Sequence, residues 1–296
     1  MEKCMFVHPD NLKISREKLD LKVAVIARPD WYMEEKETPH LIIETERGVH
    51  TRCYLGKHDD VGFLIIYGRF DRIRSTSTNI NYALTQDVIS ALQIPTVVGT
   101  FSVGSAVDND KAGTVYVPHD MVGFGNFDCT RNAVTGFRNV DMFQPFCKEA
   151  REHLVNSAKQ MDFPVKLDGT YVCFHGYPRI ETEAELNLYR NMGWQIVGQT
   201  MDPEATLARE AGCHYAAIAA TIDDRELRAK FLAKDLSVRK IIDTNIQTGR
   251  RRTFEIFLGS LKMLASLQAA QCSCVEQGKH AKSKSSFYYR PEFLSE

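Results

Sequence analysis

The sequence predicts a single α/β domain in which helices cover both faces of a central sheet. Short runs rich in β-branched residues alternate along the chain with stretches that carry apolar residues at helical spacing, and no linker interrupts this alternation. Several of the apolar runs are continuous, as in Val61–Tyr67 (VGFLIIY), and continuous runs are typical of strands buried on both faces. A chain of 296 residues is long enough to form one large domain of this kind.

The expected strands are short and mostly apolar. They span Lys22–Ala27, Leu41–Glu44, Val61–Tyr67, Pro95–Phe101, Thr114–Pro118, Thr170–Phe174, Gln195–Thr200 and His214–Thr221. The expected helices carry apolar side chains three or four residues apart. They span Asn81–Leu92, Cys147–Met161, Thr182–Met192, Pro203–Ala211, Arg225–Lys234 and Arg252–Ala270. The run of three arginines at Arg250–Arg252 is interpreted as the solvated start of the last helix.

The domain is expected to cover residues 1–276, followed by a mobile C-terminal tail over residues 277–296. The tail begins with GKHAKSKSS, which is basic and consists largely of small residues, and such a composition is typical of a segment that does not pack. Its aromatic end, FYYRPEFLSE, offers an alternative, because it could dock on the body of the protein or on a neighbouring molecule.

Charge and cysteine content narrow the class of protein. The 37 basic and 38 acidic residues give a net charge of −1, which argues against nucleic acid or an anionic membrane as a partner held by a broad positive field. No apolar run reaches the roughly 18 residues that span a bilayer, and the N-terminus lacks the apolar region of a signal peptide. The eight cysteines form no CxxC pair, so we expect reduced thiols in a cytoplasmic protein.

The pair Cys272 and Cys274 could form a disulfide under oxidation, but in a reducing cytosol two idle thiols are favoured. The histidines and cysteines show no spacing typical of metal ligands along the chain, so no metal site is predicted.

Polar or glycine-rich residues follow four of the expected strands, where ligands of α/β sheets collect. These segments are Tyr67–Arg72, Thr100–Ser105, His175–Thr182 and Thr221–Arg225. Arg69 could bind an anion as a fork of donors, and Ser102 could hold phosphate or sugar oxygens. Glu181 and Asp223 could read donors on a planar base or place a proton on its ring nitrogen. Each has a structural alternative: a surface arginine, a simple turn, or an acidic residue that caps or complements a helix start.

Two segments carry a family resemblance. Gly176–Glu185 (GYPRIETEAE) and Gln199–Gly212 (QTMDPEATLAREAG) resemble the trimeric purine nucleoside phosphorylase family, and most closely its 5′-methylthioadenosine phosphorylase branch. Further similar segments are Gly68–Phe70, Asn81–Tyr82, Thr100–Ser105, Lys111–Val115 and Pro145–Cys147, so the resemblance runs in order from about residue 22 to about residue 270.

This resemblance implies a nucleoside phosphorylase-like fold, with a central mixed sheet flanked by helices in one α/β domain. It implies the reversible phosphorolysis of a purine nucleoside, most closely 5′-methylthioadenosine or a related 6-aminopurine nucleoside, to free base and pentose 1-phosphate. Inorganic phosphate would be a co-substrate, with no cofactor. The implied assembly is a homotrimer or a dimer of trimers.

The resemblance also implies roles for individual residues. Phosphate binding falls on Arg69 and Thr100, with Ser102 assisting. Base and ribose contacts fall on Phe101, Ile180, Glu181, Gln199 and Thr200. Asp223 occupies a base-binding position that is Asn in 6-oxopurine enzymes and Asp in adenine-selective ones, and a protonated Asp there can donate to N7 of the leaving base. Glu181 matches a position that recognises N1–H of a 6-oxopurine, so the two residues imply different bases. Asp223 is given more weight because it contacts the N7 side of the leaving base, and the implied substrate is therefore a 6-aminopurine nucleoside.

Departures from the family pattern lie around the phosphate site. The family's glycine-rich loop after the first strand is replaced by Arg28-Pro29-Asp30-Trp31, and Asp71 stands near the place of a family histidine. Arg28 could supply the lost phosphate charge. Alternatively, the same pocket could belong to a phosphate-independent nucleosidase or to a catalytically inactive nucleoside-binding relative.

In the family, the loop before the Pro-Phe-Cys segment completes the active site of a neighbouring subunit. Here that loop is Phe137–Phe146, and Asn139 and Phe143 are the candidates for this role. An ordinary core turn is an equally compatible interpretation of its aromatic content.

Overall fold

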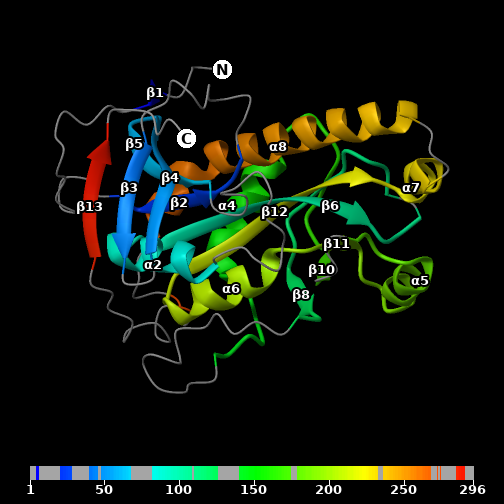
Figure 1. Ribbon diagram of the computed structural model, residues 1–296, viewed down its shortest axis with the longest axis horizontal. Helices are drawn as coiled ribbons and strands as arrows, with labels where there is room; N and C mark the ends of the chain where they lie inside the picture. The colour runs from blue at the N-terminus through cyan, green and yellow to red at the C-terminus, as the bar shows by residue number, and fades with distance from the viewer. Residues whose placement is uncertain are drawn as a thin grey trace.

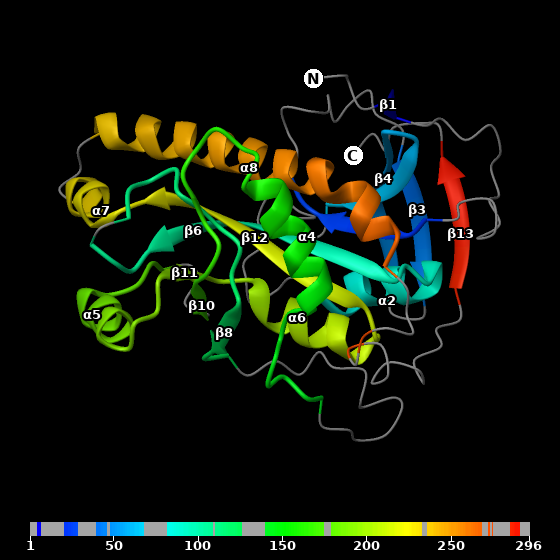
Figure 2. The ribbon, with the colours of Figure 1, turned by 180° about the vertical axis from the view of Figure 1, so that it is seen from behind.

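The computed structural model describes residues 5–6, 21–28, 40–45, 48–67, 82–108, 110–125, 140–174, 179–232, 236–267, 272, 274 and 285–290. Over these residues one sheet runs through the centre of the molecule with helices on both faces (Figures 1 and 2). The predicted α/β class with a central mixed sheet is therefore confirmed.

The principal strands follow the apolar runs of the sequence. The strands are β1 (Met5–Phe6), β2 (Val23–Ile26), β3 (His40–Thr45), β4 (Gly48–His58), β5 (Val61–Ile66), β6 (Thr96–Ser105), β7 (Val115–Tyr116), β8 (Asp120–Gly123), β9 (Val165–Lys166), β10 (Thr170–Cys173), β11 (Ile196–Gly198), β12 (His214–Asp223) and β13 (Ser285–Arg290). The helices are α2 (Tyr82–Leu92), α4 (Lys148–Ala158), α5 (Glu183–Asn191), α6 (Met201–Glu210), α7 (Arg225–Leu232) and α8 (Leu236–Ala265).

The main path of the sheet has the order β13-β3-β4-β5-β2-β6-β11-β10-β8, and β12 pairs with β6 outside this path. The strands at its centre are parallel: β2 pairs with β5 and with β6, and β12 pairs with β6 along almost its whole length. The β3, β4 and β5 strands form an antiparallel meander, and β11 pairs antiparallel with β6. The sheet is mixed because the meander and β11 add antiparallel pairs to a parallel core.

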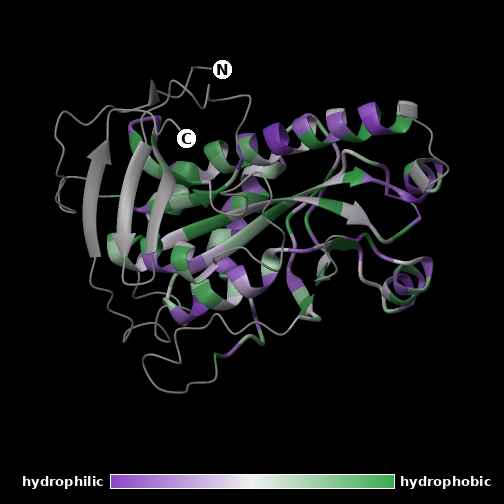
Figure 3. Cartoon of the chain, viewed as in Figure 1, coloured by the Kyte–Doolittle hydropathy of each residue, from purple (hydrophilic) through white to green (hydrophobic). Residues whose placement is uncertain are grey.

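Two core layers form because alternate residues of the central strands point to opposite faces. Ala24 and Ile26 pack in a layer with α2 and α6, whereas Val23 and Val25 pack in a layer with α4 and α8. Figure 3 shows apolar residues along the central strands and polar residues along the outer turns of α8. This double burial explains why the strands appear in the sequence as continuous apolar runs.

The contact between α8 and β12 depends on a glycine. A Cβ atom at Gly249 would lie 2.8 Å from Cβ of Ala220, which is closer than ordinary van der Waals contact. A side chain at this position would push the helix away from the strand, so glycine sets the distance between them.

Phe257 of α8 tests how much this layer contributes to stability. Its side chain is fully buried, and its ring lies 5.2 Å from Phe63 and 5.6 Å from Phe254. We expect Phe257→Ala to lower the free energy of unfolding by about 3–5 kcal/mol, because it removes buried surface and leaves a cavity. Urea denaturation measures the change. Met263→Ala on the same helix is the control, because Met263 is 52% exposed and its loss should change the value by no more than about 0.5 kcal/mol. Equal losses in the two variants would contradict this view of the core.

Several expectations about the elements were wrong. The last helix begins at Leu236 rather than Arg252, and the strand β4 was not predicted. The first half of α8 is largely solvent-exposed and rich in polar residues, so no strong apolar period marks it. Residues 285–290 were expected in a mobile tail, but they form β13, which pairs antiparallel with β3. The free edge of β3 supplies the backbone donors and acceptors that order this segment. The rest of the predicted tail lies outside the described residues.

None of the helices in the described ranges combines the length and the apolar character needed to cross a bilayer.

Candidate functional site

The candidate site lies where β6 changes its partner strand. On one side of β6, Thr96–Gly99 pair with β2, and Gly104 and Ser105 pair with β11. Between these stretches, Thr100–Val103 pair with β12 on the other side, and no strand of the described residues pairs with them on this side. The diverging ends of β2 and β11 therefore leave an opening beside the middle of β6.

A cavity of about 440 Å³ occupies this opening. Nine of the residues predicted from the sequence to bind substrate or phosphate line it. They are Arg28, Thr100, Phe101, Ser102, Ile180, Glu181, Gln199, Thr200 and Asp223. These residues come from five separate segments of the chain, and the fold brings them to one place.

The other residues predicted for the site are Arg69, Asn139 and Phe143. Arg69, Asp71 and Asn139 lie outside the described residues, so their predicted roles stay predictions. Phe143 is described: its ring is 88% exposed, it does not line the cavity, and its backbone N–H donates to Asp141.

A cluster of one buried arginine and two partly buried acids forms one end of the cavity. Asp223 ends β12, and Arg228 of α7 donates from Nη2 to Asp223 Oδ1 at 2.8 Å. Burial raises the pKa of Asp223 above its usual value, although the Arg228 charge acts in the opposite direction. Burial also raises the pKa of Glu181, which interacts electrostatically with both Arg228 and Asp223. The two acids are therefore biased towards their neutral forms, in which each can donate a proton.

A glycine makes room for this cluster. A Cβ atom at Gly104 would collide with Arg228 Nη2 and would lie 3.0 Å from Asp223 Oδ1. The ion pair thus packs directly over the backbone of β6, and its position relative to the strand is fixed by the lack of a side chain there.

Helix capping is performed by neighbouring residues. Asp224, not Asp223, caps α7, because Asp224 Oδ1 accepts from the backbone N–H of Leu227 at 2.9 Å. Likewise Thr182 caps α5 in a reciprocal capping box with Glu185, and Glu181 lies before that cap. The structural alternatives for Asp223 and Glu181 are therefore taken by other residues, which leaves both side chains for the cavity.

The segment before α5 is held in place by Arg179. Its guanidinium makes two hydrogen bonds to Glu185, both of 2.9 Å, and stacks over the ring of Phe174 at 4.3 Å. Gln199 Nε2 donates to the backbone oxygen of Arg179 at 3.3 Å. These contacts fix the segment that carries Ile180 and Glu181 against the end of β11.

The other end of the cavity carries hydroxyl groups and arginines. Thr100 Oγ1 donates to the backbone oxygen of Ile26 at 3.1 Å, so it bridges β6 and β2 where they diverge. Arg28 follows β2, and its guanidinium lies 5.5 Å from the centre of the Tyr67 ring. Thr200 precedes α6, yet its side chain makes no capping hydrogen bond. This end can therefore offer hydroxyl groups and positive charge to an anion.

Comparison with known proteins agrees with this geometry. The model of the family described as "Phosphorylase superfamily" matches residues 34–262. The chain belongs to this superfamily.

Individual relatives are named as nucleoside phosphorylases of several kinds. The chain is 29% identical over 230 residues to a probable S-methyl-5′-thioinosine phosphorylase of Thermodesulfovibrio yellowstonii. The aligned part covers 77% of this chain and 85% of the relative. The chain is also 36% identical over 158 residues to an S-methyl-5′-thioadenosine phosphorylase of Thermococcus kodakarensis, over 53% of this chain and 60% of the relative.

Solved structures share the fold. A methylthioadenosine phosphorylase from an Antarctic soil metagenomic library superimposes with a TM-score of 0.75 at 23% identity, over 87% of this chain and 90% of that one. The methylthioadenosine phosphorylase of Schistosoma mansoni gives a TM-score of 0.69 at 22% identity, over 88% and 96% of the two chains.

The sequence did not reveal every residue that lines the cavity of this phosphorylase-superfamily protein. The missed residues include Tyr67, Arg228, Ile246, Arg250 and Thr253. Ile246, Arg250 and Thr253 lie at intervals of four and three along α8, which is the spacing of one helix face. Extending the predicted helix upstream of residue 252 would have shown this face. The expectation of a solvated Arg250–Arg252 run is confirmed for Arg251, which is exposed, but it was wrong for the other two: Arg250 lines the cavity and Arg252 donates to the backbone oxygen of Gly113 at 2.7 Å.

Proposed function

We propose that this protein is a purine nucleoside phosphorylase that cleaves 5′-methylthioadenosine or a related 6-aminopurine nucleoside to free base and pentose 1-phosphate. The observation that carries the proposal is the cavity beside β6, which has a partly buried acid pair at one end and hydroxyl groups with Arg28 at the other. Superfamily membership and the named activities of the relatives support it.

The two ends fit the two halves of the reaction. A phosphate oxygen forms a bond to C1′ of the sugar while the bond from C1′ to the base nitrogen breaks, and the electron pair of that bond leaves with the base. The base then needs a proton, and a neutral Asp223 can donate one to N7. Arg228 Nη2 donates to Oδ1 of Asp223 and so orients the carboxyl group, which leaves Oδ2 to carry the proton. Thr100, Ser102, Thr200 and Arg28 supply the contacts to phosphate and ribose, with Arg69 as the expected further phosphate ligand.

Phosphate dependence tests the proposal directly. With 5′-methylthioadenosine in phosphate-free buffer, we expect adenine release to be slow, and added inorganic phosphate should increase it with saturation. Chromatography of the released adenine and of the pentose 1-phosphate measures both products. Adenosine is the matched substrate that probes the 5′ substituent.

Two other outcomes would contradict phosphorolysis. Equal rates with and without phosphate would assign the site to a nucleosidase. This alternative is considered because the glycine-rich phosphate loop of the family is missing from the sequence. Absence of release, combined with saturable thermal stabilisation by the nucleoside, would assign it to a catalytically inactive binding protein.

A specific observation favours 6-oxopurine nucleosides as a second substrate class. Within the part of the chain that the structure describes, Nε and Nη1 of the buried Arg228 have no hydrogen-bond partner. Arg228 lines the base end of the cavity, and a shift of its side chain would present these N–H donors to an oxygen at position 6 of a purine, which would accept from them, whereas an amino group would not. The kcat/KM ratio for 5′-methylthioadenosine and 5′-methylthioinosine measures which class is preferred.

For the assembly, we propose a homotrimer or a dimer of trimers, acting in purine salvage in the cytoplasm. The exposed ring of Phe143 before α4 supports an interface there, and Asn139 is the second candidate for a residue lent to a neighbour. Light scattering of the purified protein should give the mass of three or six chains. A monomer that is fully active would contradict the proposal.

A further inference from the structure

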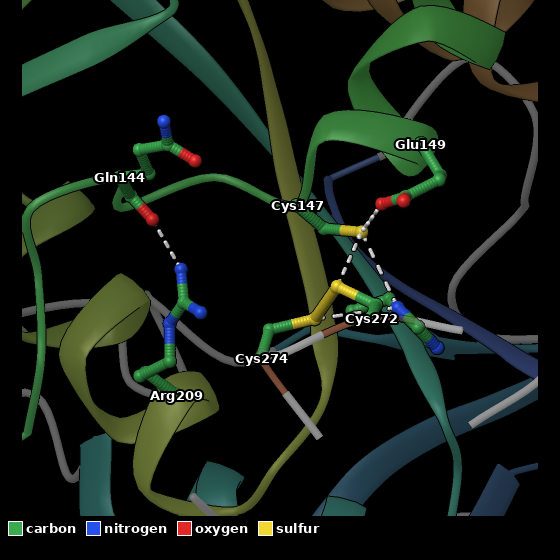
Figure 4. The surroundings of a disulfide bond; sticks show 7 residues. Gln144, Cys147, Glu149, Arg209, Cys272 and Cys274 are labelled. Carbon is green, nitrogen blue, oxygen red and sulfur yellow. Dashed lines mark hydrogen bonds between the residues drawn. A yellow bond between two sulfur atoms is a disulfide. The ribbon is translucent and has the colours of Figure 1, made fainter. Parts of the chain in front are cut away.

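Four potential metal ligands meet at the opposite end of β12 from Asp223. Cys147 precedes α4, His214 begins β12, and Cys272 and Cys274 follow α8. One donor atom from each residue lies within 4.8 Å of all the others. Figure 4 shows their sulfur atoms turned towards one another, and none of the four lines the candidate active site. Along a strand from His214 to Asp223, the separation is on the order of 30 Å.

The spacing of the donor atoms suits a tetrahedral zinc ion. Cys147 Sγ lies 3.2 Å from His214 Nδ1 and 3.6 Å from Cys272 Sγ, and Cys274 Sγ lies 3.4 Å from His214 Nδ1. A zinc ion with bonds of about 2.3 Å to sulfur and about 2.0 Å to nitrogen places neighbouring tetrahedral ligands roughly 3.5–3.8 Å apart. These three distances are within a few tenths of an ångström of that spacing, and the sulfur atoms of Cys272 and Cys274, which are bonded to each other in this structure, separate to it once their disulfide is reduced.

Burial and charge fit the same ligand. Cys147, His214 and Cys274 are at most 2% exposed, and His214 Nε2 has no hydrogen-bond partner among the described residues. That nitrogen can carry the ring proton while Nδ1 faces the sulfur atoms. Three thiolates around Zn²⁺ leave one net negative charge, and the buried Arg209 is close enough to Cys147 to interact with it electrostatically. Glu149, whose carboxylate accepts from Cys147 Sγ at 3.3 Å, adds negative charge at the rim.

We propose that the reduced protein binds one Zn²⁺ ion through Cys147, His214, Cys272 and Cys274. Three sulfur ligands and one nitrogen ligand form a closed set with no open position, which is typical of structural rather than catalytic zinc. The ion fastens the segment after α8 to the starts of β12 and α4. The expectation of no metal site, made from spacing, failed to foresee this cluster because only Cys272 and Cys274 are neighbours in sequence.

The site is linked to a redox change. Cys272 and Cys274 form a disulfide in this structure, contrary to the expectation of two idle thiols. A thiol or phosphine reductant supplies two electrons and the disulfide accepts them with two protons, which gives two thiols. Zinc binding then releases three protons, one from each cysteine, and Glu149 is positioned to accept the proton of Cys147. The disulfide and the metal thus compete for the same sulfur atoms.

The test uses the full chain, reduced with a phosphine, stripped with a chelator and then incubated with zinc. We expect one zinc per chain by elemental analysis after gel filtration, and a melting temperature that rises with zinc concentration. Protein kept in the disulfide form should bind less than a tenth as much. Cobalt in place of zinc should give the visible bands of a tetrahedral site and a sulfur-to-cobalt charge-transfer band.

Variants identify the ligands. The double variant Cys272→Ser/Cys274→Ser should bind no zinc, and Cys147→Ser provides a second test if the double variant does not fold. Cys213→Ala is the matched control, because Cys213 is buried next to His214 but its thiol donates a hydrogen bond to the backbone oxygen of Ile94. This control variant should still bind one zinc per chain. Less than a tenth of an equivalent in the reduced wild type, or a full equivalent in the double variant, would overturn the proposal. Metal content is the readout, so the result does not depend on the proposed activity.

Discussion

Asp223→Asn is expected to lower kcat for 5′-methylthioadenosine by about 10²–10⁴-fold, the usual contribution of a positioned acid. An asparagine amide can donate a hydrogen bond to N7 but cannot transfer a proton to the leaving base. KM should change much less than kcat, because the side chain keeps its size and its place beside Arg228. The preference between bases should also move from 6-amino towards 6-oxo, which the kcat/KM values for 5′-methylthioadenosine and 5′-methylthioinosine measure.

Asp224→Asn is the matched control for this experiment. Asp224 is adjacent, but it caps α7 through the backbone N–H of Leu227, and asparagine is an equally good cap. The control should keep wild-type kcat and base preference. If Asp223→Asn also kept them, Asp223 would have no role in protonating or reading the base.

Arg228→Met is expected to change the pH dependence of kcat. In the proposed mechanism Asp223 acts in its protonated form, so activity should be lost as the pH rises through its pKa. Burial raises that pKa and Arg228 opposes the rise. Removing the guanidinium charge therefore raises the pKa of Asp223 further and moves the basic limb of the pH–rate profile to higher pH. For 5′-methylthioinosine, kcat/KM should also fall by about tenfold or more, because the donors for a 6-oxo group are lost.

Arg225→Met separates this effect from a general loss of charge on α7. Arg225 lies on the same helix, is 57% exposed and pairs with Asp108 and Glu183 at the surface. Its replacement should leave the profile unchanged. An unchanged profile in Arg228→Met, with the protein still folded by thermal melting, would show that Arg228 does not control the proton on Asp223.

The sequence was informative where burial and helix capping impose a pattern. The central strands are buried on both faces, so continuous apolar runs located β2, β5, β6 and β12 within a few residues. The cavity residues that follow these strands were found for the same reason, because a strand end marks where a polar side chain must begin a loop. Arg28 after β2 and Asp223 at the end of β12 are examples, and both line the cavity.

Features that depend on long-range placement were not accessible in this way. Arg228 sits in a short polar helix, and only the approach of α7 to β6 across Gly104 makes it a cavity residue. The first half of α8 lacks a strong apolar period because most of its residues are polar and many of them are exposed. Cys147, His214 and Cys274 are separated by 67 and 60 residues in sequence, so only the packing of α4, β12 and the segment after α8 brings them together.

The change of partner along β6 has a consequence for how such a protein can diverge. In the proposed function, the groups that contact the base belong to β12, α7 and the segment before α5. The side of the cavity that would bind the anion is bounded by the end of β2. The two walls meet only along Thr100–Val103, so a replacement of the loop after β2 need not disturb the wall that reads the base. The base specificity and the identity of the attacking nucleophile could therefore change independently by mutation. Under the proposed function, such independence would permit a chain to carry Arg28 and Pro29 after β2, in place of the glycine-rich loop expected from the family resemblance, together with the acid pair.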